Sequence, residues 1–329
     1  MKLRWLLLGL FLLALLLPAG ALTYARLLDP SGGLWVRLVA FTPLALPLYV
    51  AALLTLLLAW WRAHDGWRVL AKALVAGCAL GVALHAFWAS GPYVGAATAE
   101  ARGRSTLRVM TANLELGQAS PSRVVEAAVG HGVDVLVLQE VTPAALGAMQ
   151  AAGLSTAFPH SAGAAADGAR GTMVLSTHRI RHVHRLPTGF GSYAMDVRVG
   201  GTEVHLVAVH SRPPVGDARD WMADQAAIRQ RAVGLDGPIV LAGDFNATLD
   251  HRCMRELGGR GFDDAVVQSR SRWEPTWPAA GEVSLLGLRV PSLLQLDHVL
   301  VNRAVHARST QSLTIAGTDH RAVLAVLGL

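Results

Sequence analysis

The sequence predicts an α/β fold, with an N-terminal membrane anchor of about three transmembrane helices followed by one α/β domain. Hydrophobic residues make up 52% of the 329-residue chain, but the long uninterrupted apolar segments all lie within residues 1–94. Residues 105–329 instead alternate short β-branched stretches with amphipathic ones, as strands and helices do in α/β domains. About 225 residues suffice for one domain with its own core, and residues 95–104, rich in Ala and Gly, are the predicted linker.

Three apolar segments form the predicted anchor: residues 5–22, 38–61 and 73–94. Each is close to the roughly 20 residues that an α-helix needs to cross a bilayer. Two of the segments end in Trp or Tyr, which favour the membrane interface. The first segment has a second interpretation, because residues 18–21 (PAGA) resemble a signal-peptide cleavage site. Both interpretations stay open.

The positive charges around these segments predict the orientation of the anchor. Five of them lie before the first segment or between the second and third: Lys2, Arg4, Arg62, Arg68 and Lys72. The loop between the first and second segments holds only Arg26 and Arg37. The positive-inside rule therefore places the N-terminus and the second loop in the cytoplasm. Residues 105–329 are then extracytoplasmic, whether or not the first segment is removed.

The net charge of +6 belongs mostly to the anchor. Residues 1–103 contain 8 Lys and Arg against 3 Asp and Glu, whereas residues 104–329 contain 21 Arg against 20 Asp and Glu. A domain that grips nucleic acid usually has a strong basic bias, which this one lacks. The two cysteines, Cys78 and Cys253, fall in different parts of the chain, so we expect no disulfide between them.

The α/β domain reads as a series of strands and helices. Strands are predicted at 107–115, 133–141, 171–180, 194–200, 202–214 (ending near His210), 238–242, 263–267, 294–302 and 318–326, and helices at 121–131 and 217–234, while residues 161–171 read as a loop.

Polar side chains stand at the ends of several of these apolar strands. They are Asn113, Glu140, His210, Asp244, Asn246, Asp297, Asp319 and His320. Ends of strands in α/β sheets are where active sites gather. Taken singly, each has another explanation: Asp244 and Asn246 could form an Asx turn, and a lone His or Glu can be a solvated loop residue. Because side chains alternate along a strand, Asp244 and Asn246 are expected to point to the same side.

The ordered motifs resemble a known family. TANL, LQEV, AVHSRPP, GDFNA, TWP, LDHVLV and TDHRAV follow the order and approximate spacing of the endonuclease/exonuclease/phosphatase superfamily, whose fold is deoxyribonuclease-like. The resemblance covers about residues 105–329. It implies a four-layer α/β sandwich, in which two packed β-sheets are flanked by helices and the site lies at one edge.

The resemblance also implies roles for the polar residues. It assigns binding of Mg²⁺ or Mn²⁺ to Asn113, Glu140 and Asp319, and catalysis to His210, Asp244, Asn246, Asp297 and His320. Asp244 and Asn246 would polarise the attacking water and hold the phosphate, and Asp297 and His320 would form a carboxylate–imidazole pair. His210 matches the histidine of the nuclease-like branch, but the sequence identifies no carboxylate partner for it.

The chemistry agrees with these roles independently of the family. Attack on an anionic phosphoester needs neutralised charge and an oriented nucleophile. A hard cation with oxygen ligands supplies the first, and a carboxylate or an oriented His supplies the second. The sequence contains no zinc-type Cys or paired-His spacing, no G-x-S-x-G motif and no P-loop.

Two substrates are compatible with this chemistry. The anchor, the near-neutral domain and the apolar segment 284–296 (SLLGLRVPSLLQL) favour a lipid phosphate or pyrophosphate in the bilayer. The alternative is a surface-exposed Mg²⁺-dependent nuclease, which His210 favours. Part of segment 284–296 could equally be a core strand. The intact motif set argues against a catalytically inactive interaction domain.

The architecture gives one more expectation about the substrate. A hydrophobic N-terminal region with an outward-facing domain of this superfamily resembles the teicoplanin-resistance (VanJ-type) membrane proteins. That resemblance implies a multi-pass protein of the cell membrane, an undecaprenyl-type carrier lipid of the cell envelope as substrate, and a link to antibiotic resistance.

Overall fold

The computed structural model describes residues 2–60, 65–94, 105–279, 281, 284–285 and 287–329. The chain divides into two compact units, residues 1–91 and 92–329. Trp61, Arg62 and the predicted linker 95–104 lie outside the described residues. The division into an anchor at 1–94 and an α/β domain at 105–329 remains a prediction.

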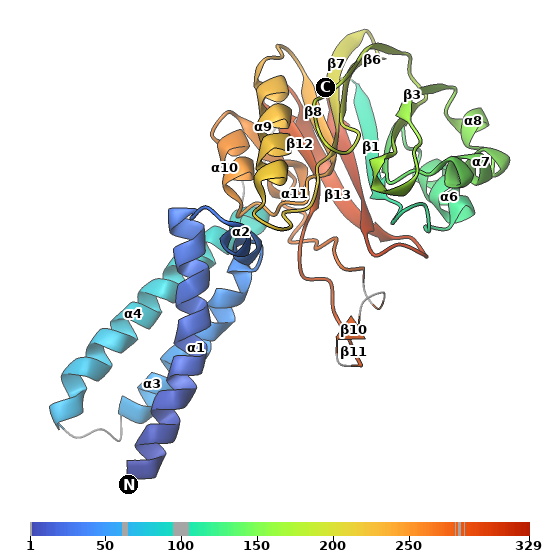
Figure 1. The fold of residues 1–329 in the computed structure, drawn as a ribbon. Helices are drawn as coiled ribbons and strands as arrows, with labels where there is room; N and C mark the ends of the chain where they lie inside the picture. Colours follow the sequence, from blue (N-terminus) through green and yellow to red (C-terminus); the bar gives the residue numbers. More distant parts are fainter. Residues whose placement is uncertain (1, 61–64, 95–104, 280, 282–283, 286) are drawn as a thin grey trace. The chain divides into compact units, whose positions relative to one another are not determined.

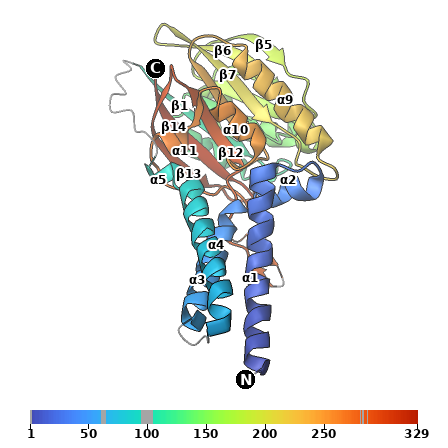
Figure 2. The same ribbon diagram turned by 90° about the vertical axis from the view of Figure 1, so that its left-hand side faces the viewer.

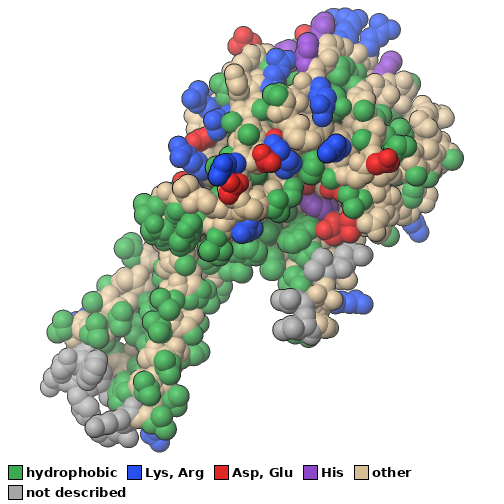
Figure 3. Space-filling model, viewed as in Figure 1, with side chains coloured by type: hydrophobic (Ala, Val, Ile, Leu, Met, Phe, Trp, Pro, Cys, Tyr) green, Lys and Arg blue, Asp and Glu red, His purple; other side chains and the backbone are tan. Residues whose placement is uncertain are grey.

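The N-terminal unit consists of helices. They are α1 (Lys2–Leu28), α2 (Gly33–Val39), the 3-10 helix η1 (Thr42–Leu44), α3 (Ala45–Trp60) and α4 (Asp65–Ala89), with α5 (Gly91–Val94) at the border. Three stretches are long and apolar enough to cross a membrane: Leu3–Leu28, Thr42–Trp60 and Val69–Ala89, with mean hydropathies of 2.4, 2.0 and 1.8. Helices α1, α3 and α4 lie side by side (Figures 1 and 2). Their surface is largely hydrophobic (Figure 3), which indicates association with a membrane.

The helices differ from the predicted segments in two places. The predicted second segment, 38–61, is interrupted, because α2 ends at Val39 and the next helical stretch starts at Thr42. Pro43 lies in the first turn of that stretch, where a missing N–H costs nothing. The first segment extends beyond 5–22, since α1 continues through Pro18 to Leu28. The Thr23 hydroxyl lies 2.9 Å from both Tyr49 Oη and His85 Nε2 and so joins α1, α3 and α4.

The second unit contains two six-stranded sheets. The first has the order β13 (His306–Thr314), β14 (Arg321–Gly328), β1 (Thr106–Asn113), β2 (Val135–Gln139), β4 (Thr172–Ser176), β3 (His160–Ala164). The second has the order β5 (Ile180–Arg185), β6 (Tyr193–Val199), β7 (Thr202–His210), β8 (Ile239–Asp244), β12 (Asp297–Asn302), β9 (Phe262–Asp264). A separate ribbon pairs β10 (Ser284–Leu285) with β11 (Leu288–Arg289). The sheets are mixed, because β1–β2 and β7–β8 are parallel pairs.

The sheets pack face to face and helices cover their outer faces (Figure 1). One hydrophobic cluster draws on both sheets, with Val109 and Val137 from the first and Leu206 and Val240 from the second. A second cluster joins the other face of the first sheet to α6 (Pro121–Gly130), α7 (Pro143–Ala151) and α8 (Leu154–Ala157). Helices α9 (Arg219–Val233) and α10 (Arg252–Gly258) lie beside the second sheet. The predicted four-layer α/β sandwich is confirmed.

Strand register brings the predicted site residues to one edge. Asn113 at the end of β1 pairs with Gln139 at the end of β2, directly before Glu140. In the second sheet, His210 is opposite Asp244 in the parallel β7–β8 pair. Asp244 is in turn opposite Asp297, the first residue of β12, in an antiparallel pair. The ends of β1, β2, β7 and β8 and the start of β12, which are distant in sequence, therefore carry the predicted site residues.

The structure differs from several local predictions: the predicted strand 171–180 ends at Ser176, and β13 at His306–Thr314 was not predicted. Residues 161–171 were expected to form a loop, but β3 occupies His160–Ala164 and pairs with β4. The Ala- and Gly-rich sequence of β3 lacks the β-branched residues that usually indicate a strand. Gly163 is required there, since a Cβ would collide with the Thr172 carbonyl oxygen. Residues 263–267 were expected to be a strand, but β9 ends at Asp264 and α11 (Ala265–Gln268) follows. The Asp264 carboxylate caps this helix by accepting a 2.7 Å bond from the Val266 N–H.

Candidate active site

Asp244 is the last residue of the buried strand β8, and Asn246 follows in the turn and is hydrogen-bonded to it. The chain reaches Asp244 through Gly243, at φ 151°, where a Cβ would collide with the backbone of Val209. Asn246 takes a left-handed conformation, at φ 47°. Its backbone N–H donates to Asp244 Oδ1 at 2.8 Å and its amide to Oδ2 at 3.2 Å. The Asx turn and the shared direction of the two side chains are therefore both present.

Asn113 links this unit to Glu140. Its amide Nδ2 donates to Asp244 Oδ2 at 3.0 Å and to Glu140 Oε1 at 3.2 Å. Glu140 directly follows β2 and has a positive φ of 59°. Its second oxygen accepts a 2.7 Å bond from the Leu116 N–H. The amide of Asn113 thus holds two carboxylates of different strands at one point.

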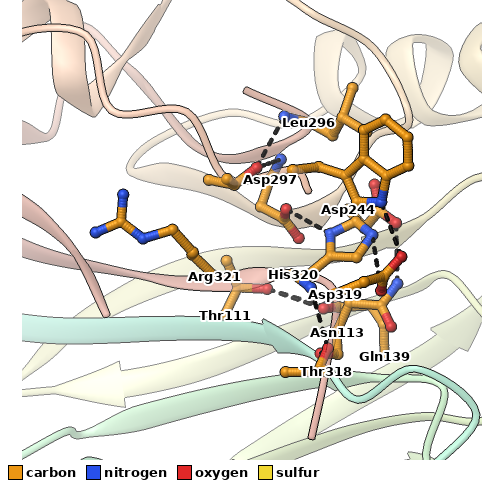
Figure 4. Close-up of polar contacts among 12 residues, drawn as sticks. Thr111, Asn113, Gln139, Asp244, Leu296, Asp297, Thr318, Asp319, His320 and Arg321 are labelled. Carbon is orange, nitrogen blue, oxygen red and sulfur yellow. Dashed lines mark hydrogen bonds and ion pairs between the residues drawn. The ribbon is translucent and has the colours of Figure 1, made fainter. Parts of the chain in front are cut away.

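Asp297 and His320 form a buried carboxylate–imidazole pair. Asp297 Oδ2 lies 2.8 Å from His320 Nδ1, and Figure 4 shows the imidazole pointing toward this carboxylate. The Thr276 hydroxyl fixes the start of β12 by accepting bonds from the Leu296 and Asp297 N–H groups, at 3.0 and 3.2 Å. The Thr318 hydroxyl donates to the Asn113 carbonyl oxygen at 2.8 Å, so the turn carrying His320 is tied to β1.

Asp319 lies beside this pair and is held from two directions. Its Oδ2 accepts a 2.8 Å bond from Trp277 Nε1, and its backbone N–H donates to Glu115 Oε2 at 2.7 Å. Its Oδ1 is 4.0 Å from His320 Nε2. The sequence predicts no active-site role for Thr276, Trp277, Thr318 or Glu115. The motif TWP, one of those carrying the family resemblance, was the available signal for the first two.

His210 reaches the same place from β7 and is fully buried. Neither ring nitrogen makes a hydrogen bond within the described part of the chain. Glu140 Oε1 lies 3.8 Å from its Nε2, and the ring packs on Phe190 with centroids 4.8 Å apart. Residues 170–172 supply no carboxylate, and the Thr172 hydroxyl there is also buried without a hydrogen bond. The hydrogen-bonded carboxylate partner that the nuclease-like branch leads one to expect is absent from the described residues.

All eight predicted residues therefore lie in one network. Glu140 contacts Asn113 and His210, Asn113 contacts Asp244, and Asp244 contacts Asn246. Ligand atoms of Asp244, Asp297 and His320 lie within 4.8 Å of one another, which connects these contacts to the Asp297–His320 pair. Asp319 lies beside that pair, 4.0 Å from His320.

Comparison with known proteins identifies the domain. Residues 110–320 match the model of the Endonuclease/Exonuclease/phosphatase family. The chain belongs to this family. Membership implies a hydrolase that acts on phosphate esters, and the family generally depends on a divalent metal. No curated protein matches the chain.

Solved structures agree with the family assignment. The crystal structure of D. rerio TDP2 complexed with single strand DNA product is 15% identical, with a TM-score of 0.56, and the match covers 68% of this chain and 100% of that one. The endonuclease/exonuclease/phosphatase from Bacteroides vulgatus is 14% identical, with a TM-score of 0.55 and coverages of 69% and 100%. The family protein from Beutenbergia cavernae is 19% identical, with a TM-score of 0.50 and coverages of 69% and 72%. At these identities the likeness confirms the fold.

The residues at the site fit the divalent cation that the family implies. Asp297 Oδ1 is buried and lacks a hydrogen-bond partner among the described residues, as do both nitrogens of His210. Buried polar atoms without partners are costly and indicate that a ligand or water satisfies them. The other donors gathered here are mostly carboxylate and amide oxygens, which hard cations such as Mg²⁺ and Mn²⁺ prefer.

Burial and mutual charge set the protonation of the site. Burial, together with the neighbouring Asp297, raises the pKa of Asp244 to about 7. Burial alone would lower the pKa of His320, but the charges of Asp297, Asp244 and Asp319 outweigh it and raise the pKa to about 10. For His210, burial dominates and lowers the pKa to about 3. Near neutral pH the site thus contains a neutral His210 and an imidazolium at His320.

Proposed function

We propose that the chain is a membrane-anchored, extracytoplasmic, metal-dependent phosphoesterase that hydrolyses a lipid phosphate or pyrophosphate. The observation that carries the choice of substrate is an exposed leucine, Leu288, on the ribbon formed by β10 and β11. The ribbon stands clear of the two sheets in Figure 1. Leu288 on β11 is 75% exposed, so its side chain is free to contact a lipid.

The base of this ribbon is joined directly to the site. Trp277 pairs with Leu294 across the base, with backbone bonds of 2.8 Å in both directions. The indole of the same Trp277 donates to Asp319. Leu294 and Leu296 are buried, so the end of segment 284–296 belongs to the core while Leu288 is exposed. A lipid held by the ribbon would present its phosphate to Asp319 and its neighbours.

Charge and anchoring support the same substrate. Residues 104–329 have almost balanced charge, and the face of the domain in Figure 3 carries acidic as well as basic side chains. Three membrane-spanning candidates would confine the enzyme to the bilayer, where a lipid substrate is concentrated. We therefore favour a carrier lipid of the cell envelope, as in the teicoplanin-resistance proteins, for this multi-pass protein.

Each residue of the site has its own role in the proposed hydrolysis. Glu140, Asn113 and Asp319 would hold Mg²⁺ or Mn²⁺, which when bound neutralises charge on the phosphoryl group. Asp244, once ionised, accepts a proton from the attacking water. The Asn246 amide and the His320 imidazolium donate to phosphoryl oxygens, where negative charge develops. Asp297 keeps His320 protonated and oriented, and neutral His210 offers one N–H and one acceptor.

The alternative is a surface-exposed Mg²⁺-dependent nuclease. The observation in its favour is His210, the histidine of the nuclease-like branch, which lies within the network at 3.8 Å from Glu140. Near neutrality this histidine is uncharged, so it would not serve as a cationic acid for a DNA leaving group.

The exposed leucine provides a test. Leu288→Ser in the detergent-solubilised full-length protein should lower turnover of a polyprenyl pyrophosphate in vesicles by about tenfold, the effect of losing roughly 1.4 kcal/mol of apolar contact. Turnover of a short-chain, water-soluble pyrophosphate should be unchanged. Val215→Ser, at a residue of the same domain that is 68% exposed, is the matched control. Equal losses on both substrates, or none, would remove the support for a lipid substrate.

A further inference from the structure

A second group of metal-ligating side chains lies on the second sheet, away from the active site. Asp196 on β6 is directly opposite His205 on β7, so their side chains share a face. Glu203 is two residues from His205 along β7 and shares this face too. The sheet core takes the alternate residues Val197, Val204 and Leu206, so this face is the outer one. His205 is five residues from His210, roughly 16 Å along the strand.

A further histidine, His182 on the edge strand β5, completes the group. Its Nδ1 lies 2.6 Å from Asp196 Oδ2, while His205 Nδ1 lies 2.6 Å from Asp196 Oδ1. The strand is irregular here, with a register shift between Arg181 and His184 and a φ of 48° at His182. One carboxylate thus receives imidazoles from the strands on both sides of it.

We propose that Asp196, Glu203 and His205, with His182 beside them, bind a divalent transition metal such as Zn²⁺. Ligand atoms of Asp196, Glu203 and His205 lie within 4.8 Å of one another. Tetrahedral ligands at the usual zinc distances are about 3.4 Å apart, so small side-chain rotations close the site. Imidazole and carboxylate together are a usual ligand set for zinc, whereas magnesium takes oxygen ligands.

Accessibility and residue type agree with a metal site. The side chains of Asp196 and His205 are 13% and 22% exposed, and that of His182 is 67% exposed, which leaves a path for the ion. Two carboxylates and one imidazole, with a second imidazole alongside, are residue types that bind zinc in proteins. A simple ion pair would need only Asp196 and one histidine.

A metal here would fasten the edge of the second sheet. The side chains of β5 are mostly exposed, so little apolar burial holds this strand to β6. Edge strands held this weakly are prone to fray or to pair with other chains. A metal bound to β6 and β7, with His182 of β5 alongside, would hold the three strands together and stabilise the domain in proportion to its occupancy.

The test is zinc stoichiometry, measured by elemental analysis after dialysis of the full-length protein in detergent. The parent protein should retain one zinc ion per chain more than His205→Ala. His184→Ala, a control on β5 outside the group, should retain as much zinc as the parent. Asp196→Asn removes a proposed ligand, so it should weaken zinc binding by more than the roughly tenfold that loss of a residue orienting a ligand costs. Zinc should raise the melting temperature of the parent further than that of His205→Ala. The active site is unchanged in all of these variants, so any difference between them belongs to this group.

Two outcomes would overturn the proposal: equal zinc content in the parent and His205→Ala, or no retained zinc in either. If His205→Ala does not fold, the exposed residue Glu203 supplies the same comparison through Glu203→Gln. Equal zinc content in that variant and the parent, with equal melting shifts, would mean that the group is an ion-pair network only.

Discussion

His298, next to Asp297 on β12, offers a sharp test of how the site is supported. Both of its ring nitrogens face acceptors: Nδ1 is 2.6 Å from Asp264 Oδ2, and Nε2 is 2.8 Å from the Ala247 carbonyl oxygen. A neutral imidazole has one N–H, so the two contacts together require an imidazolium. His298 therefore joins three segments around the site as a buried cation paired with Asp264.

Replacing this histidine should destabilise the domain strongly. Removing one partner of a buried ion pair leaves the other charge uncompensated and costs about 3–5 kcal/mol. His298→Gln keeps one donor, so we expect about 3 kcal/mol, in the lower part of that range. The assay is urea unfolding of the full-length protein in detergent, followed by tryptophan fluorescence, with the exposed His184→Gln as control.

The loss of stability in His298→Gln should also depend on pH, and its direction follows from the pKa of His298. Burial alone would lower the pKa of His298, but the hydrogen bond and charge of Asp264 raise it above its ordinary value of 6.5. A raised pKa in the folded state means that this stabilisation is complete below pH 6.5 and disappears as pH rises through the folded-state pKa. The difference between the parent and His298→Gln should be largest at pH 6 and smaller at pH 9. A difference at pH 6 no larger than the about 0.5 kcal/mol of ordinary surface changes would mean that His298 is not a buried, paired cation, as would a difference that grows with pH.

Three further predictions concern the site and the anchor. Glu140→Ala should abolish metal-dependent turnover while the melting temperature stays near that of the parent, and an unchanged Mg²⁺ dependence would remove Glu140 from the metal site. Asp244→Asn should lower the rate by about 10²–10⁴ and Asn246→Ala by roughly 10²–10³, while combining either with His320→Ala should cost far less than the product of the single losses. Fully multiplicative losses with unchanged melting would mean that these residues do not act in one step. A reporter active only in the cytoplasm, fused after Leu329, should be silent, and strong activity would reverse the proposed topology.

Much of the site could be predicted because its residues end strands. Asn113, His210 and Asp244 follow apolar runs whose lengths and β-branched content mark strands. Parallel pairing then brings their ends to one edge without any knowledge of the loops. The turn after β8 was predictable for a local reason, since the Asp244 side chain bonds to its own backbone two residues later.

The parts that escaped prediction depend on contacts between distant segments. Trp277 acquires its role from Asp319, which is 42 residues away, and the link between Thr318 and Asn113 spans 205 residues. No periodicity in the sequence encodes such pairs. Strand β3 escaped because its residues are small rather than β-branched, and its pairing with β4 rests on the space left at Gly163.

The central claim is that this site hydrolyses a lipid-linked phosphate rather than DNA. The most direct measurement compares, on one preparation of the full-length protein with Mg²⁺, phosphate release from a polyprenyl pyrophosphate with cleavage of plasmid and single-stranded DNA. Asp244→Asn serves as the blank for contaminating activities. We expect turnover of the lipid that EDTA and Asp244→Asn both abolish, with little cleavage of DNA. DNA cleavage at a far higher rate than lipid turnover, lost in Asp244→Asn, would contradict it and establish the nuclease instead.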